Sequence, residues 1–169
     1  MLPSMTKKLI LICILVFTSS ACYSSEVTTY YFIRHAEKLR IDKSDQNPSL
    51  TEKGLERASA WREIFSNVNL DAVYSTDYLR TKLTAKPTAD SKNLPIFLYD
   101  SNDIYSDSFQ LETIGKTTLV VGHSNTTNVF ANRALGAEQY GQIKDDNNSN
   151  LYIVTIIDKK ASSVLLKID

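Results

Sequence analysis

The sequence predicts an α/β fold in three layers, with a largely parallel central sheet between flanking helices. Two observations predict it. Short apolar runs alternate along the chain with longer segments of helical periodicity, and the runs are rich in β-branched and aromatic residues or are continuously apolar, as buried parallel strands are. We expect these strands at 28–33, 72–74, 96–99 and 118–121. Neither repeats nor a second domain are visible, so residues 26–169 are expected to form one domain.

Start and stop signals place the first two helices. Ser49 and Glu52 have the spacing of a capping box, and apolar residues follow at three- and four-residue intervals, which predicts a helix over 51–65. The polar residues 75–77 are expected to cap a second helix that begins at 78. This helix is expected to end at 86, because Pro87 cannot continue it.

The second half of the chain predicts a loop, two helices and a hairpin. Residues 100–108 are crowded with Asp, Ser and Asn, as loops are, and a short helix should end near Gly115. The segment after Gly122 turns into a helix that Gly136 closes. Two further strands, at 151–157 and 163–168, are expected to form a hairpin at the sheet edge. Before this hairpin, 144–150 (KDDNNSN) is expected to be a solvated loop.

Residues 1–25 have the features of a targeting segment for export. Lys7 and Lys8 precede the apolar run 9–17, which is long enough for a signal peptide and shorter than the roughly 20 residues that span a bilayer. Small residues at 18–21 follow as the cleavage zone. The sequence therefore predicts export, to the periplasm of a bacterium.

Cys22 follows that zone directly, and the sequence allows two fates for it. Ser20, Ala21 and Cys22 resemble the end of a bacterial lipobox, whereas Ser19 stands where such motifs usually carry an aliphatic residue. Cys22 is thus either lipidated, which would anchor the protein to the membrane, or a free N-terminal thiol. Tyr23 is not the aspartate that commonly retains lipoproteins at the inner membrane, so an anchored form is expected at the outer membrane.

Charge gives no sign of a nucleic-acid partner. Loss of residues 1–25 removes two lysines and no acids, which leaves 17 basic and 19 acidic residues. A domain that binds nucleic acid usually carries a basic excess. We therefore expect none as a partner.

Candidate chemistry gathers where the predicted strands end. Arg34 and His35 follow the first strand, Arg80 lies in the first turn of the second helix, and His123 follows the strand at 118–121. Ligands of open α/β sheets bind at the carboxyl ends of the strands. The chain has two histidines, and both fall at such ends.

These residue types suit phosphoryl transfer. The transferred group carries negative charge on three oxygens, so catalysis depends on positioning and positive charge. Arg34 and Arg80 could each hold the group through a fork of donors, and a neutral imidazole such as His35 is a competent nucleophile. His123, once protonated beside phosphate, would add charge from the opposite side, and the helix that begins after it favours an anion.

The motifs resemble those of the histidine phosphatase superfamily, which has the phosphoglycerate-mutase-like fold. Arg34-His-Ala-Glu-Lys38 resembles the opening motif of that family, 74–81 resembles the second-arginine segment, and 121–126 the second-histidine segment. The helix that starts at 50–54 matches what usually lies between the first two. The resemblance spans about 30–135.

The resemblance implies a phosphatase that needs neither metal nor cofactor. His35 would carry the phosphoryl group, and Arg34, Arg80 and His123 would form the phosphate pocket. The substrate would be a small phosphate ester or a phosphorylated protein. Two alternatives stay open: an envelope protein that binds a phosphoryl ligand without turnover, and a phosphomutase, against which the short chain argues because a mutase needs an enclosed site.

A general acid for the leaving group is the weakest part of the pattern. Active family members generally place a carboxylate after the third strand, where this chain has Asp100 and Asp103. Asp103 is our first candidate and Asp100 the second. Both could instead simply form an Asx turn.

Overall fold

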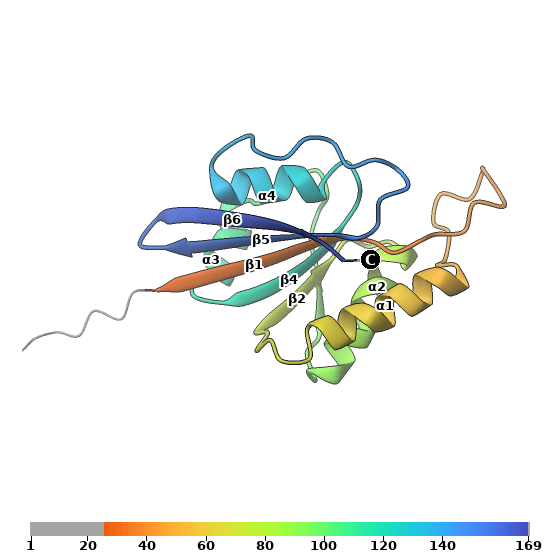
Figure 1. Ribbon diagram of the computed structural model, residues 1–169, viewed down its shortest axis with the longest axis horizontal. Coiled ribbons are helices and arrows are strands. Elements are labelled where there is room, and N and C mark those ends of the chain that lie inside the picture. Colours follow the sequence, from red (N-terminus) through yellow and green to blue (C-terminus); the bar gives the residue numbers. More distant parts are fainter. Residues whose placement is uncertain (1–25, 169) are drawn as a thin grey trace, which may run out of the picture.

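Six strands form one mixed sheet in the computed structural model, which describes residues 26–168 (Figure 1). The strand order is β3-β2-β4-β1-β5-β6. The strands are β1 (Val27–Arg34), β2 (Ala72–Ser75), β3 (Ile96–Leu98), β4 (Thr117–Gly122), β5 (Asn150–Ile157) and β6 (Lys160–Lys167). The strands from β3 to β1 pair in parallel, while β5 and β6 form an antiparallel hairpin at the edge. The predicted fold class and the edge hairpin are confirmed.

Two layers of helices cover the sheet. The helices are α1 (Glu52–Ile64), α2 (Leu79–Ser91), α3 (Asp107–Thr113) and α4 (Thr127–Leu135). In Figure 1, α1 and α2 lie together below the sheet and α4 lies above it. Trp61 and Phe65 pack with Ala85 against the β1 and β4 side chains on one face, whereas Phe109 and Phe130 fill the core on the other.

The first two helices begin within one residue of the predicted positions, but the predicted capping side chains are wrong. Thr51, and not Ser49, caps α1, since its Oγ1 accepts a hydrogen bond of 3.0 Å from the backbone N–H of Gly54. No side chain of 75–77 caps α2; the Asn47 Oδ1 accepts from the backbone N–H of Leu79 instead, at 2.7 Å.

The helix α2 also passes through Pro87, where the sequence predicted its end. Pro87 cannot donate the backbone hydrogen bond of a regular helix, which disfavours its place there. Beyond it, however, Thr88 and Ala89 are buried against the sheet, as Ala85 is before it. Burial of this continuous face stabilises the helix by more than Pro87 destabilises it. The free energy of burial depends on the sheet and cannot be read from the local sequence around Pro87.

The C-terminal ends of the parallel strands meet at one edge. Arg34 pairs with Gly122, and Ser75 pairs with Val121 one residue earlier on β4. The segments that follow β1, β2 and β4 therefore leave the sheet side by side. Gly136 closes α4 in the left-handed conformation, with φ of 73°, as predicted.

Candidate functional site

The strand register brings both histidines to one place. The backbone N–H of His35 donates to the carbonyl of Gly122 at 2.8 Å, so the residue after β1 lies beside the end of β4. The rings of His35 and His123 are 5.6 Å apart between centroids and stand at 66° to each other. Both side chains are largely buried.

His35 is held as a neutral imidazole with a free nitrogen. Its Nδ1 lies 2.7 Å from the Ala36 carbonyl, which can only accept, so Nδ1 carries the proton and Nε2 keeps its lone pair. Burial lowers the pKa of His35 to about 3, against the Ala36 hydrogen bond and with the help of nearby positive charge on Arg34. A neutral ring with an unprotonated Nε2 is the form that can act as a nucleophile.

A chain of hydroxyl groups orients His123. Its Nε2 lies 2.9 Å from Thr76 Oγ1, which lies 3.0 Å from Thr81 Oγ1. Thr81 has one hydroxyl proton and faces the carbonyls of Thr76 and Tyr78, at 3.0 and 2.9 Å, so it donates to a carbonyl and accepts from Thr76. Thr76 in turn accepts from His123, which places the proton of the neutral ring on Nε2. Burial, together with Arg80 and Arg34, lowers the pKa of His123 to about 4, so the ring is neutral while no anion is bound.

Arg34 is fixed in the wall of the site by the loop before β5. Its Nη1 donates to the carbonyls of Lys144, Asp145 and Asn147 at 2.8–3.0 Å. Its Nη2 donates to Asp145 Oδ1 at 2.9 Å. The residue is 2% exposed, and its Nε is buried with no hydrogen-bond partner among the described residues.

Arg80 reaches the same site from the first turn of α2. Its guanidinium stacks on the ring of Tyr78, 4.3 Å from the centroid, and Nη1 donates to the carbonyl of Gln46 at 3.4 Å. Its Nε is also buried and has no partner within the described part of the chain. Arg80, like Arg34, therefore has one hydrogen-bond donor that is unpaired within the described residues.

These four residues line one cavity of about 290 Å³. The structure thus brings Arg34, His35, Arg80 and His123 together, as the sequence predicted. The rest of the wall is polar: Lys38, Tyr78, Asp145, Ser101, Asn102 and residues 124–126. The last of these lead into α4, whose N-terminus favours an anion.

The loop 144–150 is not the free solvated loop that the sequence predicted. Besides its contacts to Arg34, it supplies Asn148, whose Nδ2 donates to the carbonyl of His35 at 2.8 Å. Asn148 and Ser149 are buried. Asn and Asp are usual in exposed turns, so no local signal indicated that this segment holds the site.

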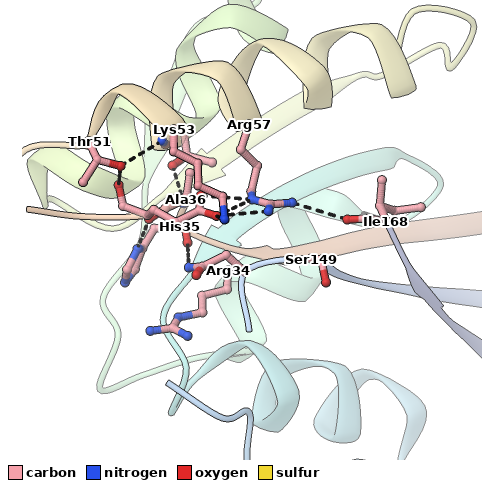
Figure 2. Close-up of polar contacts among 12 residues, drawn as sticks. Arg34, His35, Ala36, Thr51, Lys53, Arg57, Ser149 and Ile168 are labelled. Carbon is pink, nitrogen blue, oxygen red and sulfur yellow. Dashed lines mark hydrogen bonds and ion pairs between the residues drawn. The ribbon is translucent and has the colours of Figure 1, made fainter. Parts of the chain in front are cut away.

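The segment after His35 is anchored to α1 (Figure 2). Arg57 donates through Nε and Nη2 to the Glu37 carboxylate at 3.0 Å, and its Nη1 donates to the Ile168 carbonyl at 3.3 Å. On the α2 side, Thr84 Oγ1 accepts from the backbone N–H of Ala36 at 2.9 Å. Figure 2 shows Arg57 extending from α1 toward this segment and Ile168. His35 therefore sits on a backbone that two helices hold.

The two acid candidates lie elsewhere. Asp103 and Asp100 both line a neighbouring cavity of about 230 Å³ that His35 does not line. Asp100 Oδ1 accepts from the backbone N–H and the Nδ2 of Asn102, at 2.8 and 3.0 Å, in the Asx-turn arrangement. Of the site residues predicted within 26–168, only the acid candidates Asp103 and Asp100 do not line the cavity of Arg34, His35, Arg80 and His123.

Two further findings concern ions and membranes. Within residues 26–168, no three His, Cys, Asp or Glu side chains are grouped so that they could hold a metal ion. No helix in the same range is both long and apolar enough to cross a bilayer. Cys22 and the rest of the predicted targeting segment lie outside the described residues.

Comparisons with known proteins agree with this geometry. The model of the histidine phosphatase superfamily, branch 1, matches residues 30–101, which include Arg34, His35 and Arg80. No curated protein matches the sequence.

Several solved structures share the fold. A mycobacterial glucosyl-3-phosphoglycerate phosphatase is 10% identical and has a TM-score of 0.66, over 85% of this chain and 100% of its own. The protein histidine phosphatase SixA, solved with tungstate, is 17% identical with a TM-score of 0.64, over 82% of this chain and 96% of its own. The α-ribazole phosphatase of Shigella flexneri is 14% identical with a TM-score of 0.63, over 82% and 96%. The family match, together with the site, supports a phosphatase.

Proposed function

We propose that this protein is a metal-independent phosphatase that works through a phosphohistidine. The support is that the chain has the fold of the histidine phosphatase superfamily and matches its sequence model across Arg34, His35 and Arg80. His35 is the nucleophile in this proposal. Arg34, Arg80 and His123 hold the phosphoryl group.

One observation carries the proposal. Arg34 and Arg80 each bury an Nε that has no partner among the described residues, and both side chains line the cavity of His35. A buried donor without an acceptor costs free energy, about 1–3 kcal/mol. An oxyanion bound between the two guanidinium groups would offer an acceptor to both donors, once a small movement of the side chains exposes the two Nε atoms. Phosphate suits them because the Arg fork matches its oxygens.

The reaction follows from the state of His35. Its Nε2 lone pair attacks phosphorus as the bond to the leaving atom breaks, which yields N-phosphohistidine and the departing group. Water then attacks phosphorus, the N–P bond breaks, and phosphate and neutral His35 are restored. Arg34 and Arg80 compensate the charge on the equatorial oxygens throughout.

The proton for the leaving group narrows the substrate class. Within residues 26–168, Asp145 is the one carboxyl group that lines the cavity shared by Arg34, His35, Arg80 and His123, and its hydrogen bonds to Arg40 and Arg34 lower its pKa, so it is ionised near neutrality. An alkoxide leaves poorly without a general acid. The site therefore favours leaving groups that depart unaided. Aryl phosphates and a nitrogen-bound phosphate on a protein side chain are of this kind.

The test is turnover of an aryl phosphate in the presence of a chelator. We expect hydrolysis by the native protein, an acid-labile and base-stable label on it after rapid quenching, and neither with His35→Asn. Circular dichroism must show the variant folded. Undiminished turnover by folded His35→Asn would contradict the nucleophile.

The absence of Asp103 from the cavity also favours one alternative, a protein that binds a phosphoryl ligand without turnover. Such a protein would bind phosphate or tungstate in calorimetry as strongly as an enzyme would. It would show no turnover and no label. The same assay therefore separates the two.

We propose further that the protein is exported. Cys22 is then either lipidated or the free first residue of the released protein. The support is the order of Lys7 and Lys8, the apolar run and Ser20-Ala-Cys22. Mass spectrometry of the mature N-terminus in a bacterial host checks this. An acylated Cys22 is expected for the anchored form, which should fractionate with the outer membrane, and an uncleaved N-terminus would contradict export.

A further inference from the structure

Asp145 binds the arginine that the substrate needs. Its Oδ1 accepts from Arg34 Nη2 at 2.9 Å and its Oδ2 accepts from Arg40 at 2.8 Å. In the described part of the chain it is also the sole acidic residue that lines the cavity shared by Arg34, His35, Arg80 and His123. An anion therefore already lies at the edge of a site built for anions.

The two partners of this ion pair differ in freedom. The Arg34 side chain is 3% exposed and its Nη1 is held by three backbone carbonyls, so it stays in place whatever its other donors contact. The Asp145 side chain is 69% exposed. It can turn into solvent or remain on Arg40, whose side chain is 55% exposed, when phosphate takes its place on the buried Arg34.

The donors of Arg34 show where the two anions meet. A bidentate contact to phosphate uses two guanidinium nitrogens. Nη1 is occupied by carbonyls, so the contact must use the unpartnered Nε and the adjacent Nη2. Nη2 is the nitrogen that carries Asp145. A phosphate in this position and the Asp145 carboxylate would repel each other.

We propose that Asp145 is an exchangeable internal anion, which occupies Arg34 Nη2 in the empty site and gives it up to phosphate. Asp145 thereby weakens the retention of the phosphate product and of the phosphoryl group of the substrate. Arg40 receives the displaced carboxylate. This inference rests on the proposed function of the same cavity and adds a residue that sets its affinity.

The chain offers a matched control in Asp146. It is the next residue, it is exposed, and within residues 26–168 its side chain has no hydrogen bond or ion pair. It lines a neighbouring cavity and not the one that Arg34, Arg80 and His123 share. Asp145→Asn and Asp146→Asn remove the same charge from the same loop and keep its shape. We would measure inhibition of aryl phosphate hydrolysis by inorganic phosphate and by tungstate, at one ionic strength, for the native protein and both variants.

We expect the inhibition constant for phosphate to fall roughly two- to fivefold in Asp145→Asn, the range that the loss of an exposed charge pair allows. Asp146→Asn should change it by a clearly smaller factor. Asp145→Ala, which also removes the side-chain oxygens, should match Asp145→Asn. Thermal melting checks that all three are folded.

Three results would overturn the inference: an unchanged constant in Asp145→Asn, equal changes in the two Asn variants, or weaker phosphate binding in Asp145→Asn. The last would mean that Asp145 only holds Arg34 in position. The proposed function fails on a different result, namely a native protein that neither binds phosphate nor hydrolyses the substrate. If the native protein binds phosphate and hydrolyses the substrate, but Asp145→Asn and Asp146→Asn have the same inhibition constant, then only the proposed role of Asp145 is wrong.

Discussion

At the scale of single residues, Thr76 decides which nitrogen of His123 carries the proton of the neutral ring. The hydroxyl chain from His123 through Thr76 to Thr81 has one consistent direction, because it ends on carbonyls that only accept. Among residues 26–168, Thr76 has no hydrogen bond to Arg34, His35 or Arg80, and it does not line their cavity. It is a positioning residue.

Replacement of Thr76 by Val should therefore slow turnover without unfolding the protein. We expect kcat/KM to fall roughly two- to tenfold, the value of one hydrogen bond, because His123 loses its fixed orientation. Thr76→Ser keeps the hydroxyl and should restore most of the rate. Steady-state kinetics on an aryl phosphate provide the measurement.

Thr88→Val is the control for this change. Thr88 is buried on α2 as Thr76 is buried after β2, but its Oγ1 has no hydrogen-bond partner among the described residues. Its replacement by Val loses no bond, so the rate should be unaffected. If Thr88→Val and Thr76→Val were equally slow, general packing and not the contact to His123 would explain both.

At the scale of elements, the site depends on how closely α1 approaches the segment after β1. A Cβ placed on Gly54, in the first turn of α1, would lie 2.2 Å from the carbonyl oxygen of Glu37. That carbonyl accepts from the backbone N–H of Thr51 at 2.9 Å. Only a glycine allows the helix to start this close to the residues that follow His35.

Gly54→Ala should destabilise the protein and disturb the site together. Alanine raises helix propensity by up to about 1 kcal/mol. The clash with a backbone atom costs roughly 1–3 kcal/mol and should win. Displacement of 35–37 should also reduce kcat, since small errors of position are costly in catalysis. Urea denaturation and kinetics measure the two effects.

Gly141 serves as the matched position. A Cβ there meets nothing within 4 Å, and its φ is not positive. Gly141→Ala should therefore keep both stability and rate. A stable, fully active Gly54→Ala would show that α1 can move away from Glu37 without effect on His35.

At the scale of the whole molecule, the two buried histidines link stability to pH. Burial lowers the pKa of His35 to about 3 and that of His123 to about 4, below the 6.5 of a free imidazole. Between about pH 6.5 and 4 the unfolded chain therefore binds protons that the folded chain does not. Stability should fall as the pH falls through this window, and above pH 6.5 the histidines should have no such effect.

Urea denaturation at pH 7.5 and 4.5 measures this loss. The double variant His35→Asn, His123→Asn retains every carboxylate, so the difference between its slope and that of the native protein isolates the histidines. We expect the double variant to lose less stability on acidification. Identical slopes would mean that both rings take up protons freely in the folded state.

The sequence by itself determined the fold class and the convergence of four residues. Alternation of apolar runs and helical segments predicted the layers, and parallel strands must place their carboxyl ends at one edge. Arg34 ends β1, His35 and His123 directly follow the neighbouring strands β1 and β4, and Arg80 comes four residues after Thr76. These four residues come together because of the order of strands and helices, which local sequence patterns predict well.

Tertiary structure alone decided what surrounds these four residues. Asp145 and Asn148 reach Arg34 and His35 across more than 100 residues of chain, and polar residues in a loop show no partner in the sequence. Asp103, which the sequence favoured as the acid, lines a different cavity, since a short loop can turn either way after β3. Pro87 remains inside α2 because burial of Ala85 and Ala89 exceeds a local penalty. In each case the deciding free energy comes from contacts between distant segments, which no local pattern contains.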